Sequence, residues 1–317
     1  MKTIEVYIYM VIAIIGAGAM GCLYGAYLSK ENDVIMLDSY EPQVDSINQN
    51  GITLVEADSS EEVYKNVKAY KSGTCKESVD LVIVFVKSTY TEEALEENKD
   101  LFGKDTFVMT LQNGAGNDRK IKKYVDEHNI IIGTSKHNAV NLGEGKIKHG
   151  GSGMTTIGSN YNADNVVESV ASCLRKSGIE IEVSDDIQRI IWSKLFVNLS
   201  INTFTALIQT PIGYMIQNES AWNFAKRLVY EAVEVAVADG TYFDRREALE
   251  MVKDVCIKAG NGYSSMYQDR KKKIKMEIDA INGAIVEQAK LYGVPTPYNS
   301  LIVDLIHAVE GAYDLYD

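Results

Sequence analysis

Residues 11–28 read VIAIIGAGAMGCLYGAYL. No charge interrupts this stretch before Lys30, and its length alone is compatible with a membrane span, which needs about 20 apolar residues. The glycines favour a different interpretation, because Gly16, Gly18 and Gly21 form the pattern G-x-G-x-x-G directly after a β-branched run. Between an expected strand and an expected helix, this pattern is the fingerprint of a dinucleotide-binding fold.

The predicted cofactor-binding residues lie in this loop and at the end of the second expected strand. Asp38 ends that strand, about 20 residues after the first glycine, where a carboxylate hydrogen-bonds a ribose 2′-hydroxyl. No lysine or arginine occurs between Lys30 and Lys65 to hold a 2′-phosphate, so the residues favour NADH over NADPH. A simple turn that begins at Asp38 is the competing interpretation. The loop residues are Gly16, Ala17, Gly18, Ala19, Met20 and Gly21.

Length and composition indicate a two-domain globular protein. The chain has 317 residues, of which 46 % are hydrophobic and 24 % charged. A net charge of −12 argues against a nucleic-acid or membrane partner, and we interpret the basic run at 270–275 as a solvated helix face. The four cysteines are scattered without metal-ligand spacing, which predicts a reduced, cytoplasmic protein with no metal site.

The first residues of the chain precede a natural beginning at Met10. They contain one lysine, an early Glu5 and no suitable cleavage site, so we do not expect a signal peptide. Residues 1–9 are expected to be either an added lead-in or the product of a misassigned start codon.

The pattern of apolar residues in the sequence changes near residue 184. Before it, buried runs alternate with short helical segments, which predicts an α/β Rossmann domain with a doubly wound, mostly parallel sheet over residues 1–183. After it, helical periodicity predicts an all-α domain over residues 184–317. The expected strands are 11–15, 33–38, 51–57, 66–72, 80–88, 106–114 and 129–140, with a hairpin at 146–160. The expected helices are 186–207, 221–240, 246–260 and 275–293, with a last one after Tyr298.

One expected helix carries an unusual polar stripe. Lys194, Asn198 and Asn202 stand at i, i+4 and i+8, so a continuous α-helix places them on one side. The positions between them are mostly apolar, which predicts a helix fit for burial. Buried polar groups need partners, so we interpret the stripe as a candidate catalytic face, with a solvated face as the alternative.

The chain resembles the ketopantoate reductase (2-dehydropantoate 2-reductase) family from about residue 10 to its end. The resemblance implies a Rossmann domain, a helical domain and an active site in the cleft between them. It also implies hydride transfer from NADPH to the ketone of 2-dehydropantoate, giving (R)-pantoate on the route to coenzyme A. The motifs that carry it are GAGAMG, VFVKS, LQNGAGN, WSKLFVNLSINTFTAL, SSMYQD, EIDAINGAIV and GVPTPYN.

The resemblance also implies a role for each site residue. Lys194 matches the general acid that protonates the developing alkoxide, a task suited to a cation. Glu277 matches the acid that pairs with this lysine and helps to fix the substrate. The remaining matches are Asn198 and Asn202 for the hydroxyl and carboxylate end of the substrate, Ser265 for its carboxylate, Asn113 near nicotinamide and substrate, and Lys87 on the cofactor side.

Structural alternatives exist for several of these residues. A lone histidine at a strand end, His137, is expected to be structural rather than an acid. The alternatives are a helix cap for Ser265, an i, i+4 pair with Lys273 for Glu277, a turn for Asn113 and a solvated strand end for Lys87.

One departure from the family concerns the cofactor. The family places a basic residue after the second strand, where this chain has Asp38 and Ser39. This difference argues against a preference for NADPH, but it does not affect the expected hydride transfer. Two other functions remain: a reductase of another branched 2-keto acid, and a non-catalytic dinucleotide-binding redox sensor. The expected partner is a small 2-keto acid, and the apolar helices of the second half are compatible with a homodimer.

Overall fold

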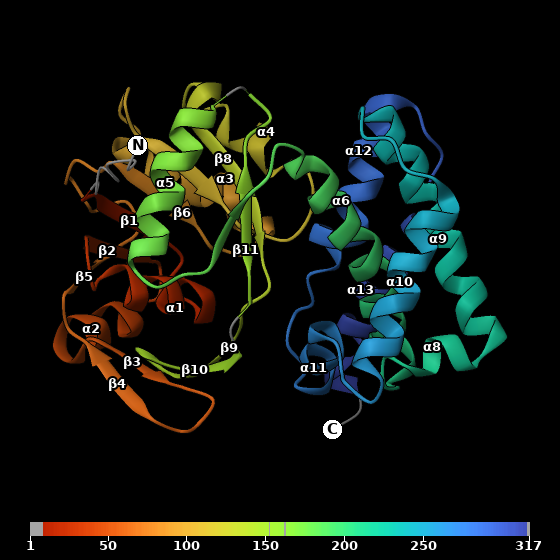
Figure 1. Cartoon of the computed structure of the whole chain (residues 1–317). Helices are drawn as coiled ribbons and strands as arrows, with labels where there is room; N and C mark the ends of the chain where they lie inside the picture. The colour runs from red at the N-terminus through yellow and green to blue at the C-terminus, as the bar shows by residue number, and fades with distance from the viewer. Residues whose placement is uncertain (1–8, 152, 162, 316–317) are drawn as a thin grey trace, which may run out of the picture. The chain divides into compact units, whose positions relative to one another are not determined.

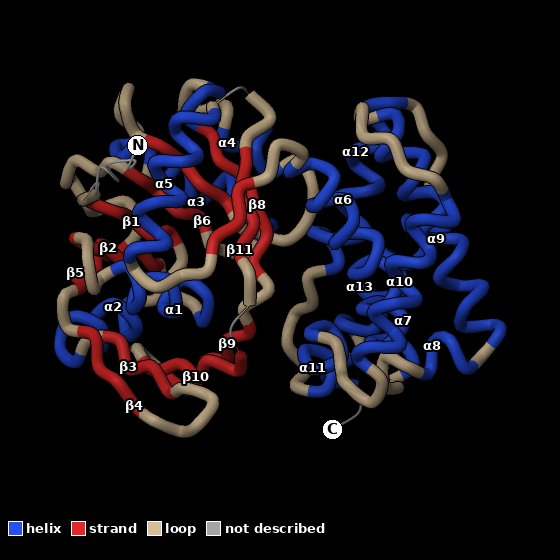
Figure 2. The backbone as a smooth tube through the Cα atoms, in the orientation of Figure 1, coloured by secondary structure: helices blue, strands red, loops and turns tan. Residues whose placement is uncertain are grey.

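The computed structural model describes residues 9–151, 153–161 and 163–315, so the expectation for residues 1–9 lies outside them except at Tyr9. The chain divides into two compact units (Figure 1). The first comprises Met1–Gln112 and Asn117–Ile187, and the second comprises Asn113–Gly116 and Gln188–Asp317. In Figure 2 the strands lie in the first unit, and the described part of the second unit contains only helices and loops.

The first unit is built on an eight-stranded sheet in the order β12-β11-β8-β7-β6-β1-β2-β5. Its strand pairs are parallel except β8 with β11, which confirms the predicted mostly parallel Rossmann sheet. The strands are β1 (Val11–Ile15), β2 (Asp33–Asp38), β5 (Val67–Lys71), β6 (Leu81–Val84), β7 (Phe107–Thr110), β8 (Ile130–Ser135), β11 (Thr155–Gly158) and β12 (Ile181–Val183). The helices of the unit are α1 (Ala19–Leu28), α2 (Glu41–Asn50), α3 (Thr91–Glu97), α4 (Asn117–Ile121) and α5 (Asp164–Lys176).

The apolar run that opens the chain is a central strand of this sheet. β1 lies between β2 and β6, and Ile12 to Ile15 have no exposed surface. A strand covered on both faces reads as a continuous apolar run rather than an alternating one. Together with the following helix α1, it therefore accounts for the stretch without a membrane span.

A second sheet was not expected. It has the order β4-β3-β10-β9 and contains β3 (Ile52–Val55), β4 (Glu61–Tyr64), β9 (Asn138–Gly143) and β10 (Lys146–Gly151). The predicted single strand at 129–140 is wrong, because it divides into β8 and β9 in different sheets. The predicted hairpin at 146–160 is also wrong. β10 pairs antiparallel with β9 instead, through a tight turn at 143–145 in which both glycines have positive φ.

The second unit packs its helices around α9 (Glu219–Ala238). The helical run Ile187–Ile208, with which this unit opens, is long and apolar enough to cross a membrane by length and composition only, and 61 % of its apolar 18-residue window is buried inside the structure, as a core helix would be. The elements are α6 (Ile187–Val197), η4 (Asn198–Asn202), α7 (Thr203–Ile208), α8 (Tyr214–Gln217), α9, α10 (Arg245–Ala259), α11 (Ser265–Lys271), η5 (Asp279–Gly283), α12 (Ala284–Tyr292) and α13 (Pro297–Gly311).

Candidate active site

The glycine-rich loop has the geometry that its fingerprint requires. Gly16 has φ +102°, and a Cβ there would lie 2.7 Å from the backbone nitrogen of Val86. A Cβ on Gly21 would lie 1.9 Å from the carbonyl oxygen of Gly16. By contrast, a Cβ on Gly18, which N-caps α1, would meet nothing within 4 Å. The loop is therefore tightly packed on its protein side and open at Gly18, where a phosphate can approach the helix N-terminus.

Hydrogen bonds hold this loop in place. The backbone N–H of Ala17 donates to Oδ2 of Asp38 over 2.8 Å, and its carbonyl accepts from Nε2 of Gln43 over 2.6 Å. Oε1 of Gln43 in turn accepts from the N–H of Gly145 over 2.9 Å, which links the loop to the second sheet. Sequence reasoning missed Gln43, because its role depends on the packing of α2 against the loop.

Asp38 has a structural role that agrees with its competing interpretation. Its Oδ1 accepts from the N–H of Tyr40 over 2.9 Å, so the carboxylate does begin a turn. Its other oxygen is directed at the glycine-rich loop. The turn and a ribose contact are compatible, because each carboxylate oxygen accepts more than one hydrogen bond.

A lysine lies next to Asp38 in the sheet although none is near it in the chain. Lys71 on β5 is the register partner of Asp38, and its ammonium lies 2.5 Å from Oε1 of Glu41. The expected absence of a basic partner considered only residues 30–65. The missing information was the pairing of β2 with β5, which strand propensity does not specify.

The loop after β6 carries the predicted residue Lys87, and Gln112 in the loop after β7 fixes that loop by hydrogen bonds. Lys87 is exposed and lies directly before a short 3-10 helix, Ser88–Tyr90. Gln112 ties the two loops together, since its Nε2 donates to the carbonyl of Val86 over 2.6 Å and to Oγ1 of Thr91 over 2.9 Å. Lys87 thus lies at the carboxyl edge of the sheet, where ligands bind in folds of this type.

Asn113 begins a short loop that belongs to the second unit. Its Nδ2 donates to Oε2 of Glu277 over 3.1 Å. The next residue, Gly114, has φ +97°, and a Cβ there would lie 2.2 Å from the carbonyl oxygen of Ala280. The Asn-Gly pair is therefore more than a turn, because it brings an amide onto a predicted catalytic carboxylate.

Lys194 lies near the end of α6, but the α-helix does not continue through the other two residues of the stripe. Residues Asn198–Asn202 form a π-helix. The expectation of one continuous α-helical stripe is therefore wrong beyond Asn198, because a π-turn bonds i to i+5 and rotates later side chains. Lys194 and Asn198 are half-buried, and Asn202 is 8 % exposed.

Two structural alternatives for site residues are wrong. The N-cap of α11 is Ser264, whose Oγ accepts from the N–H of Tyr267 over 3.1 Å, whereas Ser265 follows it with an exposed side chain. Lys273 and Glu277 do not share a helix, because Lys273 lies in the turn after α11 and the helix predicted for 275–293 begins only at residue 278.

His137 belongs to a polar cluster of the first unit. Its Nδ1 lies 3.1 Å from Nε2 of His149, whose Nδ1 lies 2.8 Å from Oε2 of Glu56. Tyr27 donates to the other oxygen of this carboxylate over 2.9 Å. Burial and the neighbouring histidine lower the pKa of His137. The contact of its Nδ1 with His149 agrees with a structural role for His137.

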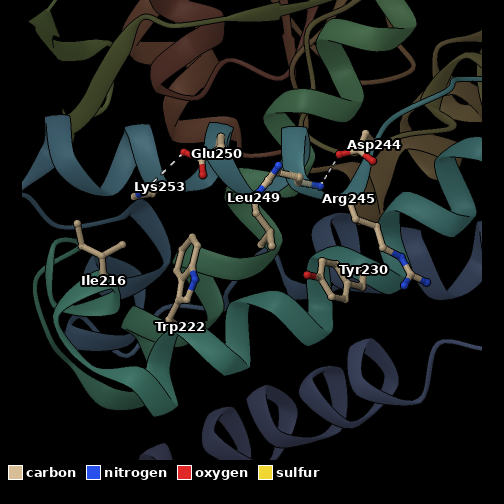
Figure 3. A pocket seen from close by; sticks show the side chains of 9 residues that line it. Ile216, Trp222, Tyr230, Asp244, Arg245, Leu249, Glu250 and Lys253 are labelled. Carbon is tan, nitrogen blue, oxygen red and sulfur yellow. Dashed lines mark hydrogen bonds and ion pairs between the residues drawn. The ribbon is translucent and has the colours of Figure 1, made fainter.

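The second unit also has a surface hollow, and none of the predicted site residues lines it. Its volume is about 490 Å³, and Figure 3 shows it between α8, α9 and α10. Within the described ranges, no group of three His, Cys, Asp or Glu side chains could hold a metal ion. The hollow is lined by Ile216, Trp222, Tyr230, Asp244, Arg245, Arg246, Leu249, Glu250 and Lys253.

Comparisons with known proteins agree with this division of the chain. The family model "Ketopantoate reductase PanE/ApbA" matches residues 12–162, and its C-terminal counterpart matches residues 186–310. A protein of Streptococcus pyogenes serotype M18 named 2-dehydropantoate 2-reductase is 33 % identical over 309 residues, covering 96 % of this chain and 100 % of that one. A Pyrococcus horikoshii protein of the same name is 33 % identical over 305 residues, with 95 % and 98 % covered.

Solved structures of similar proteins also superpose over nearly the whole chain. A D-mandelate dehydrogenase with NADH and anilino(oxo)acetate superposes with a TM-score of 0.88 at 31 % identity, covering 96 % of this chain and 100 % of that one. The 2-dehydropantoate 2-reductase of Geobacter metallireducens GS-15 superposes with a TM-score of 0.83 at 26 % identity, with 94 % and 99 % covered.

Proposed function

The chain belongs to the ketopantoate reductase family, and we propose that it reduces the ketone of 2-dehydropantoate to the alcohol of (R)-pantoate with NADH or NADPH as reductant. The observation that carries the proposal is the hydrogen bond from Asn113 to Glu277, because it joins two motifs far apart in the sequence. A non-catalytic dinucleotide sensor would have no need of this pair.

The residues of the first unit fit a dinucleotide. The open approach at Gly18 and the N-terminus of α1 suit a pyrophosphate, and the carboxylate of Asp38 suits a ribose hydroxyl. Lys87 would add a cation at the same edge of the sheet. When bound, the reduced nicotinamide would supply the hydride.

In the second unit, we assign to Lys194 the role of proton donor. An ammonium directed at the substrate ketone stabilises the negative charge that develops on its oxygen, and then donates a proton to it. Glu277, held by Asn113, would keep a carboxylate beside the substrate and the lysine. Asn198, Asn202 and Ser265 would bind the hydroxyl and carboxylate groups of the substrate as hydrogen-bond donors.

The choice between NADH and NADPH depends on two side chains of opposite charge. Asp38 would bind a ribose 2′-hydroxyl and repel a 2′-phosphate, whereas Lys71, adjacent to it, would attract the phosphate. Glu41 pairs with Lys71 and offsets its charge. We therefore propose that NADH is used at least as well as NADPH.

A second substrate class is favoured by one comparison. The D-mandelate dehydrogenase structure contains NADH and anilino(oxo)acetate, an aryl 2-oxo acid derivative. The reaction type is unchanged in this alternative, and only the pocket for the side chain of the 2-keto acid differs.

The test is the oxidation of NADH and of NADPH by the purified protein, followed by the absorbance of the reduced nicotinamide, with 2-dehydropantoate and an aryl 2-keto acid in parallel. We expect fast oxidation with 2-dehydropantoate. Faster turnover of the aryl compound would assign the second substrate class. Cofactor binding without oxidation by either substrate would contradict a reductase of these acids.

We place the enzyme in the cytoplasm, in keeping with its four free, buried cysteines.

A further inference from the structure

Two π-helical segments lie next to the proposed catalytic residues. The segment η4 contains Asn198 and Asn202, and η5 begins two residues after Glu277. π-turns are rare in proteins and are often found at functional sites. Because each N–H reaches back five residues instead of four, the regular ladder is interrupted and the carbonyls of the wider turn need other partners.

Hydroxyl groups provide part of this compensation in η4. Oγ of Ser200 donates to the carbonyl of Phe196 over 2.7 Å. Oγ1 of Thr203 donates to the carbonyl of Leu199 over 2.6 Å. The carbonyl of Leu199 accepts a second hydrogen bond, of 3.1 Å, from Nδ2 of Asn282 in η5. A side chain of one π-segment thus binds the backbone of the other.

The amide of Asn282 is oriented by a buried chain of hydrogen bonds that ends on a carboxylate. Its Nδ2 also donates to Oδ1 of Asn299 over 2.9 Å. Nδ2 of Asn299 donates to Oε2 of Glu231 over 2.8 Å. Oε2 of Glu231 also accepts from the backbone N–H of Asn299 over 2.9 Å, so the donor end of the Asn299 amide faces Glu231 and its oxygen faces Asn282. The amide group of Asn282 must then present both of its N–H donors, one to Asn299 and one to Leu199.

The burial of this chain makes its bonds hard to replace. Asn282 and Asn299 have no exposed surface, and Glu231 is 8 % exposed. Oδ1 of Asn282 is buried with no hydrogen-bond partner in the described part of the chain. An unpartnered buried oxygen costs free energy, so an apolar residue would suit this position better if its only task were to fill space.

We propose that Asn282 is a positioning residue, which ties the π-turn carrying Asn198 and Asn202 to the π-turn that follows Glu277. The inference rests on the proposed function and deepens it. Leu199 lies between the two asparagines, so a shift of its carbonyl moves both amides relative to Glu277. Misplacement of binding groups by about 1 Å is enough to lower rates about a hundredfold.

The test compares Asn282→Leu with a matched control, Asn32→Leu. Asn32 is also buried, and its Nδ2 likewise donates to a helix carbonyl, that of Leu28, and to a side-chain oxygen, that of Ser177. We expect both variants to lose thermal stability. Only Asn282→Leu should raise the KM for 2-dehydropantoate, by about tenfold or more, and lower kcat, while the KM for the nicotinamide cofactor stays within about twofold.

Hydrogen exchange of the backbone amides of residues 198–204 provides a readout that needs no substrate. Asn282→Leu should accelerate it about tenfold relative to the control. Equal losses of stability in the two variants, with unchanged KM, kcat and exchange, would overturn the proposal. Because exchange does not depend on turnover, it still decides this inference if the protein is inactive on every 2-keto acid, a result that would contradict only the proposed function. If Asn282→Leu does not fold, Asn282→Ser, which keeps one donor, should show intermediate effects, and wild-type behaviour of that variant would also overturn the proposal.

Discussion

The side-chain amide of Asn113 donates a hydrogen bond of 3.1 Å to Oε2 of Glu277. Both side chains are half-buried, and the loop that carries Asn113 is pressed against the backbone of Ala280 through Gly114. The carboxyl group is therefore held in place by a neutral amide donor. Such a group is suited to orient a cation or a substrate hydroxyl beside it.

A double-mutant cycle on this pair tests whether the bond serves catalysis. We expect Glu277→Gln to lower kcat/KM about a hundredfold and Asn113→Ala about tenfold. Because the two groups act through one hydrogen bond, the double variant should lose less than the product of the single effects, with a coupling of about 0.5–3 kcal/mol. Effects that simply multiply would show that the two residues act independently.

The role of Lys194 is tested by removing its ammonium. Lys194→Ala should depress kcat about a hundredfold or more, because the developing alkoxide loses both its electrostatic partner and its proton donor. Lys253→Ala, on α10 and outside the proposed site, should leave kcat unchanged and serves as the control. Normal turnover of Lys194→Ala by steady-state kinetics would exclude this lysine as the general acid.

Cofactor preference should respond in opposite directions to two substitutions on neighbouring strands. Asp38→Ala should raise the ratio of kcat/KM for NADPH to that for NADH, because it removes repulsion of a 2′-phosphate and a ribose partner. Lys71→Met should lower the same ratio. The ratio cancels the loss of stability that we expect when the N–H groups of Ala17 and Tyr40 lose their acceptor.

The isosteric variant Asp38→Asn removes the charge and keeps one of the two acceptor oxygens, so it preserves part of this structural role. It should shift the ratio in the same direction as Asp38→Ala. If neither substitution of Asp38 changes the ratio, the ribose role is wrong and Asp38 only holds the loop at Ala17 and the turn at Tyr40.

The fold was predictable where local pattern and tertiary environment agree. The run at β1 is apolar throughout because both faces of the strand are covered, and close packing in the following loop requires glycine at Gly16 and Gly21. Strand partners were not predictable in the same way. The alternation at 146–158 is compatible with any half-buried strand, and only the turn at 143–145 directs β10 to β9.

For the candidate site, the sequence offers residue types but not the backbone geometry that carries them. The amides at Asn198 and Asn202 were found from their spacing, yet that spacing assumed an α-helix. The same apolar residues occur in α-turns and in π-turns, so amino-acid composition does not distinguish the two kinds of turn. The available signal was the set of hydroxyls at Ser200, Thr203 and Thr205, each of which donates to a carbonyl of the preceding turn.

A histidine of α13 brackets the segment that contains Glu277. Nε2 of His307 lies 2.8 Å from Oδ1 of Asp279, and its Nδ1 lies 3.1 Å from Oε2 of Glu310. The other oxygen of Glu310 accepts from the N–H of Met276 over 2.6 Å. Burial acts to lower the pKa of His307, but hydrogen bonds to Glu310 and Asp279 outweigh it, so the pKa is raised from 6.5.

The sign of the resulting pH dependence follows from this shift. The folded protein holds the proton of His307 more tightly than the unfolded chain does, so its contribution to stability is complete below pH 6.5 and is lost as the pH rises through the raised pKa. The contribution should not exceed about 1 kcal/mol, because the imidazole is 40 % exposed and the pair is screened by solvent. Denaturant unfolding of His307→Gln and wild type across this window should show the difference between them shrinking as the pH increases. A difference that grows with pH would mean that His307 is neutral in the folded protein and that its two carboxylate partners do not hold it charged.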